Sequence, residues 1–191
     1  MDNSESLKRL WGSYKTFTLP TIHCSLFTTP MQRAFPQKGH TMYHYFAPME
    51  GLTDSVYRRL HHKYFPGVDR YYMPFFSPTV HRQLTQRESR ELPEADSVSF
   101  AAVPQVLTKV PEDFLWASEK LRDLGYEEVN LNLGCPSGTV VTKKRGAGFL
   151  AFPVALDAFL EEVCNGINRL GMKISVKTRV GKDSPDEWEE L

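Results

Sequence analysis

The sequence predicts an α/β protein with a parallel sheet, and three observations lead to that class. Short apolar segments alternate with longer segments of helical period from Met42 onwards, as they do when β-strands are joined by crossover helices. Proline and glycine stand at the ends of many segments and keep the connections short. The polar residues best suited to chemistry follow the apolar segments directly, which places them at the carboxyl ends of the strands.

Residues 1–41 differ from the remainder of the chain, because they are rich in Ser, Thr and Pro and show no sustained period. We interpret them as a disordered N-terminal extension and residues 42–191 as the folded domain. The extension holds five Lys or Arg against two Asp or Glu, although the whole chain has a formal net charge of +0. A nucleic-acid-binding function must therefore depend on local basic clusters.

The cysteines and the hydropathy indicate a compartment. The chain has three cysteines, an odd number without zinc-ligand spacing, and a reduced, cytoplasmic setting is the simplest interpretation. No apolar run approaches the roughly 18–20 residues that a membrane span needs. We therefore expect neither a metal site nor a membrane partner.

The first predicted elements are a strand over residues 42–47, which ends at Pro48, and a helix over residues 53–64 with Thr53 as its N-cap. The apolar residues of this helix share one face: Val56, Leu60 and Tyr64. A second strand spans residues 69–76 despite Pro74, and the polar residues 79–99 predict a loop with a short helix.

Three further strands and two helices continue the pattern. A strand over residues 102–108 precedes a helix over residues 111–124, for which Gly125 is the expected C-cap. The remaining elements are a strand over 127–133, a helix over 153–170, a strand over 173–178 and the start of a helix in SPDEWEEL.

The length constrains the architecture. A closed (β/α)8 TIM barrel needs about 250 residues, whereas 150 residues run from Met42 to Leu191. We therefore expect an incomplete TIM barrel with about five of the eight strand–helix units. An open doubly wound sheet is the alternative fold, but no GxGxxG sequence follows the first strand.

The segment VNLNLGCPSGTVVTKKRGAGFL, residues 129–150, contains the strongest candidate for chemistry. Its apolar start predicts a buried strand, and Cys135 lies just beyond the carboxyl end of that strand. Pro136 stops the strand and stiffens the turn, so the thiol is expected on a rigid loop. The usual role of a lone cysteine, a small buried hydrophobe, better suits Cys24 and Cys164.

Three charged or polar positions offer further candidates. Gln105 lies inside an apolar strand and either binds a ligand or ties down backbone, because buried amides need partners. Lys177 would be costly to bury without an anionic partner, which favours a negatively charged ligand. Glu50, after the first strand, is either a ligand-binding residue or a simple turn residue.

A basic cluster follows Cys135 on the same loop: Lys143, Lys144 and Arg145. Charge runs are usually solvated surface, but the position of this one beside the candidate thiol also suits contacts with RNA phosphates.

Four segments in this order resemble the tRNA-dihydrouridine synthases: APMEGLTDSVYR, VPQVL, LNLGCPSGTV with GAGFL, and VKTRVG. The resemblance extends over roughly residues 44–182 and is most specific in NLGCP and GAG. It implies a flavoprotein built as a (β/α) barrel followed by a small helical domain. Strands six to eight fall outside the resemblance, so we expect this chain alone to bind FMN weakly or not at all.

The resemblance implies FMN as the flavin and NADPH, or NADH, as the reductant. Hydride would pass from the reduced flavin to carbon six of selected tRNA uridines, and Cys135 would give a proton to carbon five. The implied flavin-binding residues are Pro48, Met49, Glu50, Gln105 and Lys177. The residues implied near the uracil or the tRNA are Asn132, Lys143, Lys144, Arg145 and Arg179.

Two other functions fit the same residues. One is an FMN-dependent dehydrogenase of the dihydroorotate or dihydropyrimidine type, which acts on a free pyrimidine, and the other is an inactive fragment. The basic cluster and the APMEG sequence favour tRNA as the partner. A monomer is the expectation for a full-length protein.

Overall fold

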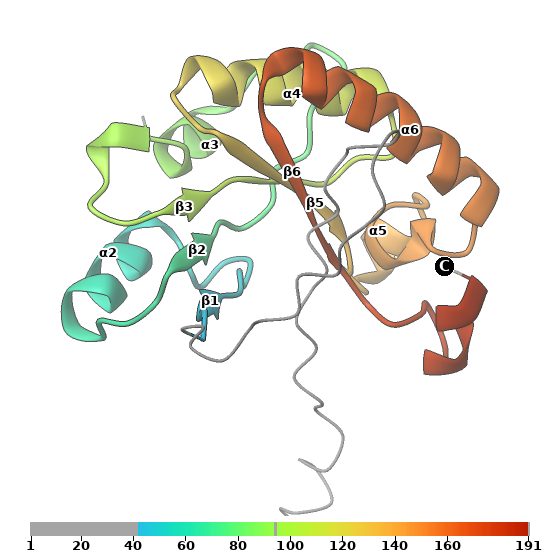
Figure 1. Ribbon diagram of the computed structural model, residues 1–191, viewed down its shortest axis with the longest axis horizontal. Coiled ribbons are helices and arrows are strands. Elements are labelled where there is room, and N and C mark those ends of the chain that lie inside the picture. Colours follow the sequence, from blue (N-terminus) through green and yellow to red (C-terminus); the bar gives the residue numbers. More distant parts are fainter. Residues whose placement is uncertain (1–41, 94, 191) are drawn as a thin grey trace, which may run out of the picture.

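The computed structural model describes residues 42–93 and 95–190, and it confirms the predicted α/β class with parallel strands (Figure 1). The strands form two three-stranded parallel sheets. The first contains β1 (Tyr45–Phe46), β2 (Arg70–Tyr72) and β3 (Ala102–Val103), and the second contains β4 (Gln105–Val106), β5 (Glu128–Leu133) and β6 (Lys173–Thr178). The predicted N-terminal extension lies outside the described residues.

β3 and β4 are two parts of one predicted strand, interrupted at Pro104, which has no backbone N–H to donate. β3 pairs with β2, and Phe76, beyond the end of β2, forms a parallel bridge with Val106 of β4. On its other side β4 pairs with β5, which pairs with β6. The strand order thus follows the chain, whereas a doubly wound sheet reverses its order at a switch point.

Prolines make the observed strands shorter than predicted. The strand predicted over 102–108 becomes two short strands, so six strands are described instead of five. The strand predicted over 69–76 ends at Tyr72, before Pro74, and β1 has only 2 residues. Because proline cannot donate to a ladder, an apolar pattern overestimates strand length wherever proline follows closely.

The helices agree better with the sequence pattern. α6 (Pro153–Leu170) and β6 have the predicted bounds, and α4 (Pro111–Asp123) and α2 (Ser55–Tyr64) differ by one or two residues. The shorter helices are α3 (Gln86–Glu91), α5 (Gly138–Val141), and the 3-10 helices η1 (Ala95–Ser97), η2 (Gly146–Phe149) and η3 (Pro185–Glu190). The helix expected to start in SPDEWEEL is the 3-10 helix η3. No helix in the described part of the chain is long and apolar enough to cross a membrane.

Two cap predictions are wrong by one residue. Asp54, rather than Thr53, caps α2, and its carboxylate accepts a hydrogen bond from the Tyr57 N–H at 2.8 Å. The C-cap of α4 is Leu124, and Gly125 follows it with φ = 88°. Glycine adopts this left-handed conformation without the steric penalty of a Cβ.

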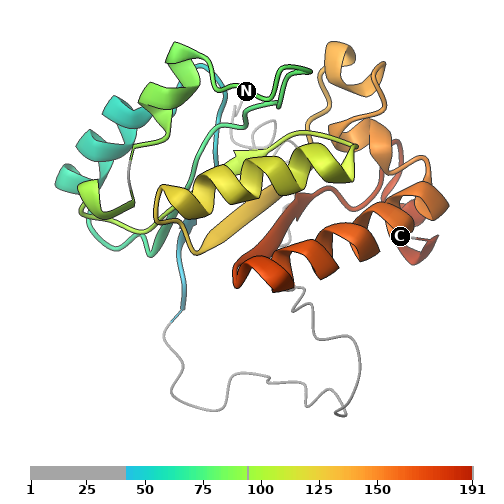
Figure 2. The same cartoon turned by 90° about the horizontal axis from the view of Figure 1, so that it is seen from above.

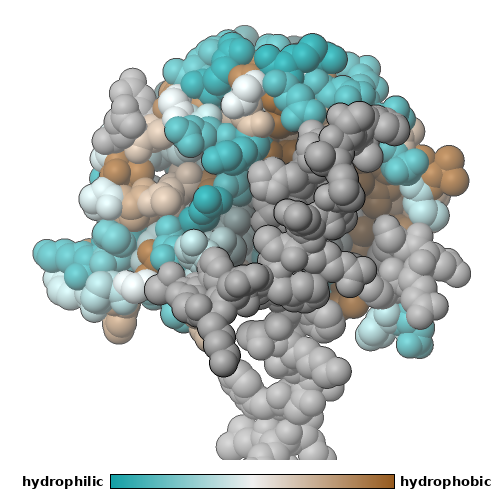
Figure 3. Space-filling model, viewed as in Figure 1, coloured by the Kyte–Doolittle hydropathy of each residue, from teal (hydrophilic) through white to brown (hydrophobic). Residues whose placement is uncertain are grey.

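The apolar core lies where α4 and α6 pack side by side over one face of β5 and β6 (Figure 2). Phe159 of α6 meets Phe114 of α4 edge to face, with ring centroids 6.2 Å apart. The outer surface over these helices, at the top of Figure 3, is largely hydrophilic. Completely buried members of the core include Phe114, Leu121, Val129, Leu131, Val163 and Ile167.

α2 does not follow the same rule. The residues predicted as its apolar face, Val56, Leu60 and Tyr64, have exposed fractions of 61, 51 and 64%. The residue that α2 buries is Arg58, which is 2% exposed. Within residues 42–93 and 95–190, the apolar period of this helix therefore marks an exposed face.

Candidate active site

All strands are parallel, so their carboxyl ends meet at one edge of the fold. The predicted site residues lie on the strands or in the loops that follow them: Pro48, Met49 and Glu50 after β1, Gln105 on β4, Asn132 on β5, Cys135, Lys143, Lys144 and Arg145 after β5, Lys177 on β6 and Arg179 after β6. This is the edge at which α/β proteins commonly bind ligands.

β5 has one apolar and one polar face. Successive residues of a strand point to opposite faces, and one set of β5 residues joins the core: Val129, Leu131 and Leu133. Asn130 and Asn132 therefore point to the other face. They are 1% and 6% exposed, so this polar face lies inside the protein.

The polar face continues across the neighbouring strands. Asn130 is paired in register with Gln105 of β4 and with Ser175 of β6. Asn132 is paired with Lys177 of β6. The structure thus brings together Gln105, Asn132 and Lys177, three of the residues selected from the sequence.

Asn132 fixes the loop that carries Cys135. Its Oδ1 accepts hydrogen bonds from the N–H groups of Gly134 at 3.1 Å and Cys135 at 3.0 Å. Its Nδ2 donates to Oε1 of Gln105 at 2.8 Å. Cys135 is half-buried and its thiol is free. The buried amide therefore sets where the thiol stands at the end of β5.

The GAG segment packs directly against the same loop. The Ala147 N–H donates to the Cys135 carbonyl at 3.1 Å. Gly146 has φ = 53°, and a Cβ there would lie 2.9 Å from the Cys135 carbonyl oxygen. A Cβ on Gly148 would lie 2.7 Å from the Val141 carbonyl oxygen. Backbone occupies the space that any side chain would need, so the loop can close only over glycine at both positions.

Lys177 is half-buried and lies opposite Asn132. It makes no hydrogen bond or ion pair with any other residue in 42–93 or 95–190. Its three N–H donors are therefore available to water or to an acceptor ligand. Arg179 lies nearby, because its Cγ is 3.6 Å from the position that a Cβ would take on Gly134.

Thr53 anchors the loop after β1. Its hydroxyl accepts a hydrogen bond from the Met49 N–H at 2.8 Å and donates one to the Met49 carbonyl at 3.1 Å. Pro48 is half-buried, Met49 is 57% exposed and Glu50 is exposed. Glu50 lines a cavity of about 290 Å³ whose other walls include Phe75, Phe76, Ser77, Arg87 and Glu91.

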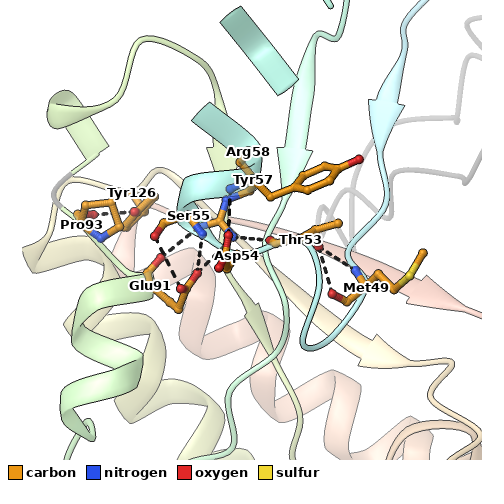
Figure 4. Close-up of polar contacts among 9 residues, drawn as sticks. All are labelled: Met49, Thr53, Asp54, Ser55, Tyr57, Arg58, Glu91, Pro93 and Tyr126. Carbon is orange, nitrogen blue, oxygen red and sulfur yellow. Dashed lines mark hydrogen bonds and ion pairs between the residues drawn. The ribbon is translucent and has the colours of Figure 1, made fainter. Parts of the chain in front are cut away.

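The buried Arg58 connects this loop to α3 (Figure 4). Its guanidinium donates to the Thr53 carbonyl at 2.8 Å, to the Glu91 carboxylate at 3.3 Å and to the Glu91 carbonyl at 3.2 Å. The Ser55 N–H donates to the same carboxylate at 2.9 Å. Burial lowers the pKa of Arg58, and the negative charge of Glu91 opposes that shift. This ion pair holds together the loops that follow β1 and β2.

The basic cluster lies between α5 and the GAG segment. Lys143 and Lys144 are exposed and Arg145 is half-buried. Lys144 has φ = 55°, and its amine lies 4.5 Å from the centroid of the Phe152 ring, a cation–π geometry. One member of the cluster is therefore already in contact with the protein, and the other two remain open to a partner.

Sequence reasoning missed Asn130 and Ser175. Asn130 Oδ1 accepts from Nε2 of Gln105 at 2.7 Å, and its Nδ2 donates to the Ser175 hydroxyl at 2.9 Å. A signal was present, because the polar residues of VNLNL and of KISVKT recur at every second position. That period predicts a polar face opposite the apolar one.

Three kinds of polar group meet at the carboxyl edge of the parallel strands. They are the half-buried thiol of Cys135, the buried amides of Gln105 and Asn132, and the amine of Lys177, which has no partner among the described residues. This combination defines an α/β enzyme with its active site at the strand ends.

The model of the dihydrouridine synthase (Dus) family matches residues 45–191, so the chain belongs to that family. This confirms the resemblance found in the four sequence segments.

Three relatives illustrate the similarity. The chain is 28% identical over 153 residues to the probable tRNA-dihydrouridine synthase 2 of Bacillus subtilis, and this alignment covers 75% of this chain and 43% of that protein. It is 28% identical over 151 residues to the probable tRNA-dihydrouridine synthase of Staphylococcus epidermidis, with 74% of this chain and 42% of that protein covered. It is 28% identical over 138 residues to the probable tRNA-dihydrouridine synthase 1 of Synechocystis, with 72% of this chain and 37% of that protein covered. The chain thus spans about two fifths of the length of these curated relatives.

Proposed function

We propose that residues 42–191 form part of a TIM barrel that catalyses dihydrouridine formation in cytoplasmic tRNA. The barrel is supported by the strand order, which follows the chain from β1 to β6. The substrate is supported by the names of the relatives, which specify tRNA. The main support for the chemistry is the hydrogen bond from the Cys135 N–H to Asn132, which is itself paired in register with Lys177.

FMN fits the residues at this edge. The unpaired amine of Lys177 suits the electron-rich pyrimidine edge of a flavin, because it can stabilise negative charge there. Gln105 uses one N–H and one lone pair of its amide within the protein, and because it is 1% exposed it would reach a flavin with its second N–H only after a local movement. Pro48, Met49 and Glu50 stand at the same edge and would line the flavin. When bound, FMN would supply a hydride that originates from NADPH or NADH.

Cys135 would supply the second hydrogen. Hydride addition at carbon six of the uracil places the electron pair of the former double bond on carbon five, next to a carbonyl. The Cys135 S–H would protonate carbon five, and solvent would return a proton to the thiolate. A positioned general acid contributes roughly 10²–10⁴ in rate. Asn132 would keep the thiol in place, and it would contact the uracil from the polar face.

The tRNA would meet the protein around this edge. Lys143, Arg145 and Arg179 are available for phosphate contacts, which position an RNA without specifying its sequence. The target uridine must leave its base stack to reach the thiol, which costs a few kcal/mol.

The test of catalysis uses the chain with NADPH, tRNA transcripts that lack dihydrouridine and a large excess of FMN, because weak binding of the flavin is expected. Nucleoside mass spectrometry should detect uridines heavier by two hydrogens, and Cys135→Ala should lower the rate by roughly 10²–10⁴. An unchanged rate in Cys135→Ala would overturn the role of the thiol. Turnover of free uracil or dihydroorotate, without turnover of tRNA, would favour a free-pyrimidine dehydrogenase instead.

The test of the cofactor site is a fluorescence titration with FMN, which detects weak binding. Lys177→Met should raise the dissociation constant about tenfold, the equivalent of roughly 1.4 kcal/mol. Lys173→Met is the matched control, because Lys173 is an exposed lysine at the other end of the same strand. Equal effects of the two substitutions would reject the proposed role of Lys177.

A further inference from the structure

A continuous chain of side-chain hydrogen bonds runs through the polar face from the Cys135 loop to Glu128, at the amino end of β5. We propose that this chain positions the loop, and that Asn130, Ser175 and Glu128 are positioning residues for the thiol. The catalytic purpose of the chain rests on the function proposed above, whereas its effect on the loop can be measured without flavin or RNA.

The direction of the chain is fixed at the loop. Backbone N–H groups can only donate, so the atom of Asn132 that faces Gly134 and Cys135 must be its oxygen. The other end of this amide must then be the nitrogen, which donates to Gln105 at 2.8 Å. Gln105 therefore presents its oxygen towards Asn132.

The same logic passes through two more groups. Because the oxygen of Gln105 faces Asn132, its nitrogen faces Asn130 and donates to Oδ1 at 2.7 Å. The nitrogen of Asn130 then donates to the Ser175 hydroxyl at 2.9 Å. A hydroxyl has one proton, and that of Ser175 goes to Oε1 of Glu128 at 2.6 Å.

The far end of the chain is charged. Glu128 accepts from Ser175 through one carboxylate oxygen and pairs with Arg70 through the other. An ionised carboxylate can only accept, so this end requires Ser175 to donate towards it.

Both ends of the chain therefore demand the same orientation of every amide between them. If the amide of Asn130 alone were reversed, its Nδ2 would face Nε2 of Gln105, and two donors would then meet. If the amide of Asn132 were reversed, its Nδ2 would face the N–H groups of Gly134 and Cys135, which are also donors. Gln105 and Asn130 are 1% exposed, so water cannot compensate for either mismatch, and an unsatisfied buried polar group is costly. Ser175 and Glu128 thus stabilise, from the far end, the same orientation in which Asn132 holds the Cys135 loop.

The test compares Ser175→Ala with Ser175→Thr in the 191-residue chain, without FMN or tRNA. Alanine removes the hydroxyl that joins Asn130 to Glu128, and threonine keeps it. Amide hydrogen exchange, resolved to the residues of β5 and the loop, should be about fivefold to tenfold faster at Gly134 and Cys135 in Ser175→Ala, as expected for the loss of one hydrogen bond. In Ser175→Thr, which keeps the hydroxyl, the amides of Gly134 and Cys135 should exchange as slowly as in the unsubstituted chain.

Ser118→Ala is the control for the loss of a buried hydroxyl elsewhere. Ser118 is completely buried on α4 and donates to the Phe114 carbonyl at 2.8 Å. The Ser118→Ala variant should have a lower urea midpoint, but amide hydrogen exchange at Gly134 and Cys135 should not be selectively faster. If Ser175→Ala does not fold, Ser175→Cys keeps the volume with a weaker donor and should accelerate the same two amides to a smaller extent.

Two results would overturn the positioning role: no change at Gly134 and Cys135 in the Ser175 variants, or equal acceleration throughout β5. The second would mean that the hydroxyl contributes only to general stability. Absence of tRNA modification by the chain at saturating FMN would reject the proposed function and leave the exchange result intact. The two hypotheses can therefore fail separately.

Discussion

The helix that follows β1 and the helices that follow β4 and β5 bury opposite kinds of residue. α4 and α6 cover the sheet with completely buried apolar side chains, among them Phe114, Val163 and Ile167. α2 exposes its apolar residues and buries Arg58, which is held by Thr53 and Glu91. One part of the molecule is thus stabilised by apolar packing, and the other by a polar cluster beside the candidate active site together with the ring contacts of His61 with Phe46 and Tyr71 and of His62 with Tyr71.

This contrast shows what a hydrophobic period can and cannot predict. The 3.6-residue period locates α2, α4 and α6 equally well. It cannot say which face a neighbouring element covers, because that depends on the strands and helices packed against it. The buried arginine of α2 shows that the side chain at the contact decides the interaction, whatever the pattern around it.

The largest effect is expected in the apolar part. Phe114→Ala should lower the free energy of unfolding by about 3–5 kcal/mol, because it removes a completely buried ring and leaves a cavity. Urea unfolding followed by circular dichroism measures the change. Phe114→Leu, which fills more of the space, should cost less. A loss below about 1 kcal/mol in Phe114→Ala would contradict the core described for α4 and α6.

The polar part should respond almost as strongly to one substitution. Arg58→Met should destabilise the protein by about 2–3 kcal/mol, less than a fully buried pair, because Glu91 keeps 28% of its side-chain surface exposed. Arg59→Met is the matched control, since Arg59 is an exposed arginine on the same helix and should change stability by less than about 0.5 kcal/mol. Equal unfolding midpoints for both variants would show that the cluster contributes no stability.

Alkaline pH offers a smaller, titratable effect. Burial raises the pKa of Tyr126 to about 12, and its hydroxyl donates to the Pro93 carbonyl at 2.5 Å. The folded state therefore keeps a proton that the unfolded state loses near pH 10. The associated stability, up to about 2–3 kcal/mol, is complete below pH 10 and is lost as the pH rises towards 12. Tyr126→Phe should make the free energy of unfolding less dependent on pH between about 10 and 12. If the slope in this range is unchanged, Tyr126 is not the group responsible.

The smallest effect is expected on the exposed face of α2. Leu60→Asn should change the urea midpoint by the equivalent of less than about 0.5 kcal/mol, because Leu60 is 51% exposed. Leu121→Asn, at a completely buried position of α4, provides the comparison and should cost several times more. Similar losses in the two variants would mean that the outer face of α2 is covered in solution.

Much of the fold followed from the sequence alone. The bounds of α6 and β6 were predicted correctly, because proline and glycine mark the ends of the helix and an alternating pattern of apolar and polar residues marks the strand. The strands around Pro74 and Pro104 were predicted too long. There, the loss of a backbone donor outweighs the apolar pattern.

The candidate site was predicted in part. The positions of Cys135, Asn132, Gln105 and Lys177 at one edge follow from the parallel order of the strands, and the structure places them there. The hydrogen bonds of Asn132 could not be derived, because they depend on the register between β4, β5 and β6. The roles assigned to these residues remain predictions until FMN binding and tRNA turnover are measured.

The close packing of the GAG segment has a consequence for how freely this gene can vary. At Gly146 and Gly148 even one methyl group would overlap backbone of the Cys135 loop or of α5, whereas a Cβ on Gly138 meets nothing within 4 Å. In a saturation library selected for folded protein, codons 146 and 148 should therefore return glycine almost exclusively, and codon 138 should accept many residues. Two of the three glycines would then be essential for shape alone, whatever chemistry the neighbouring thiol performs.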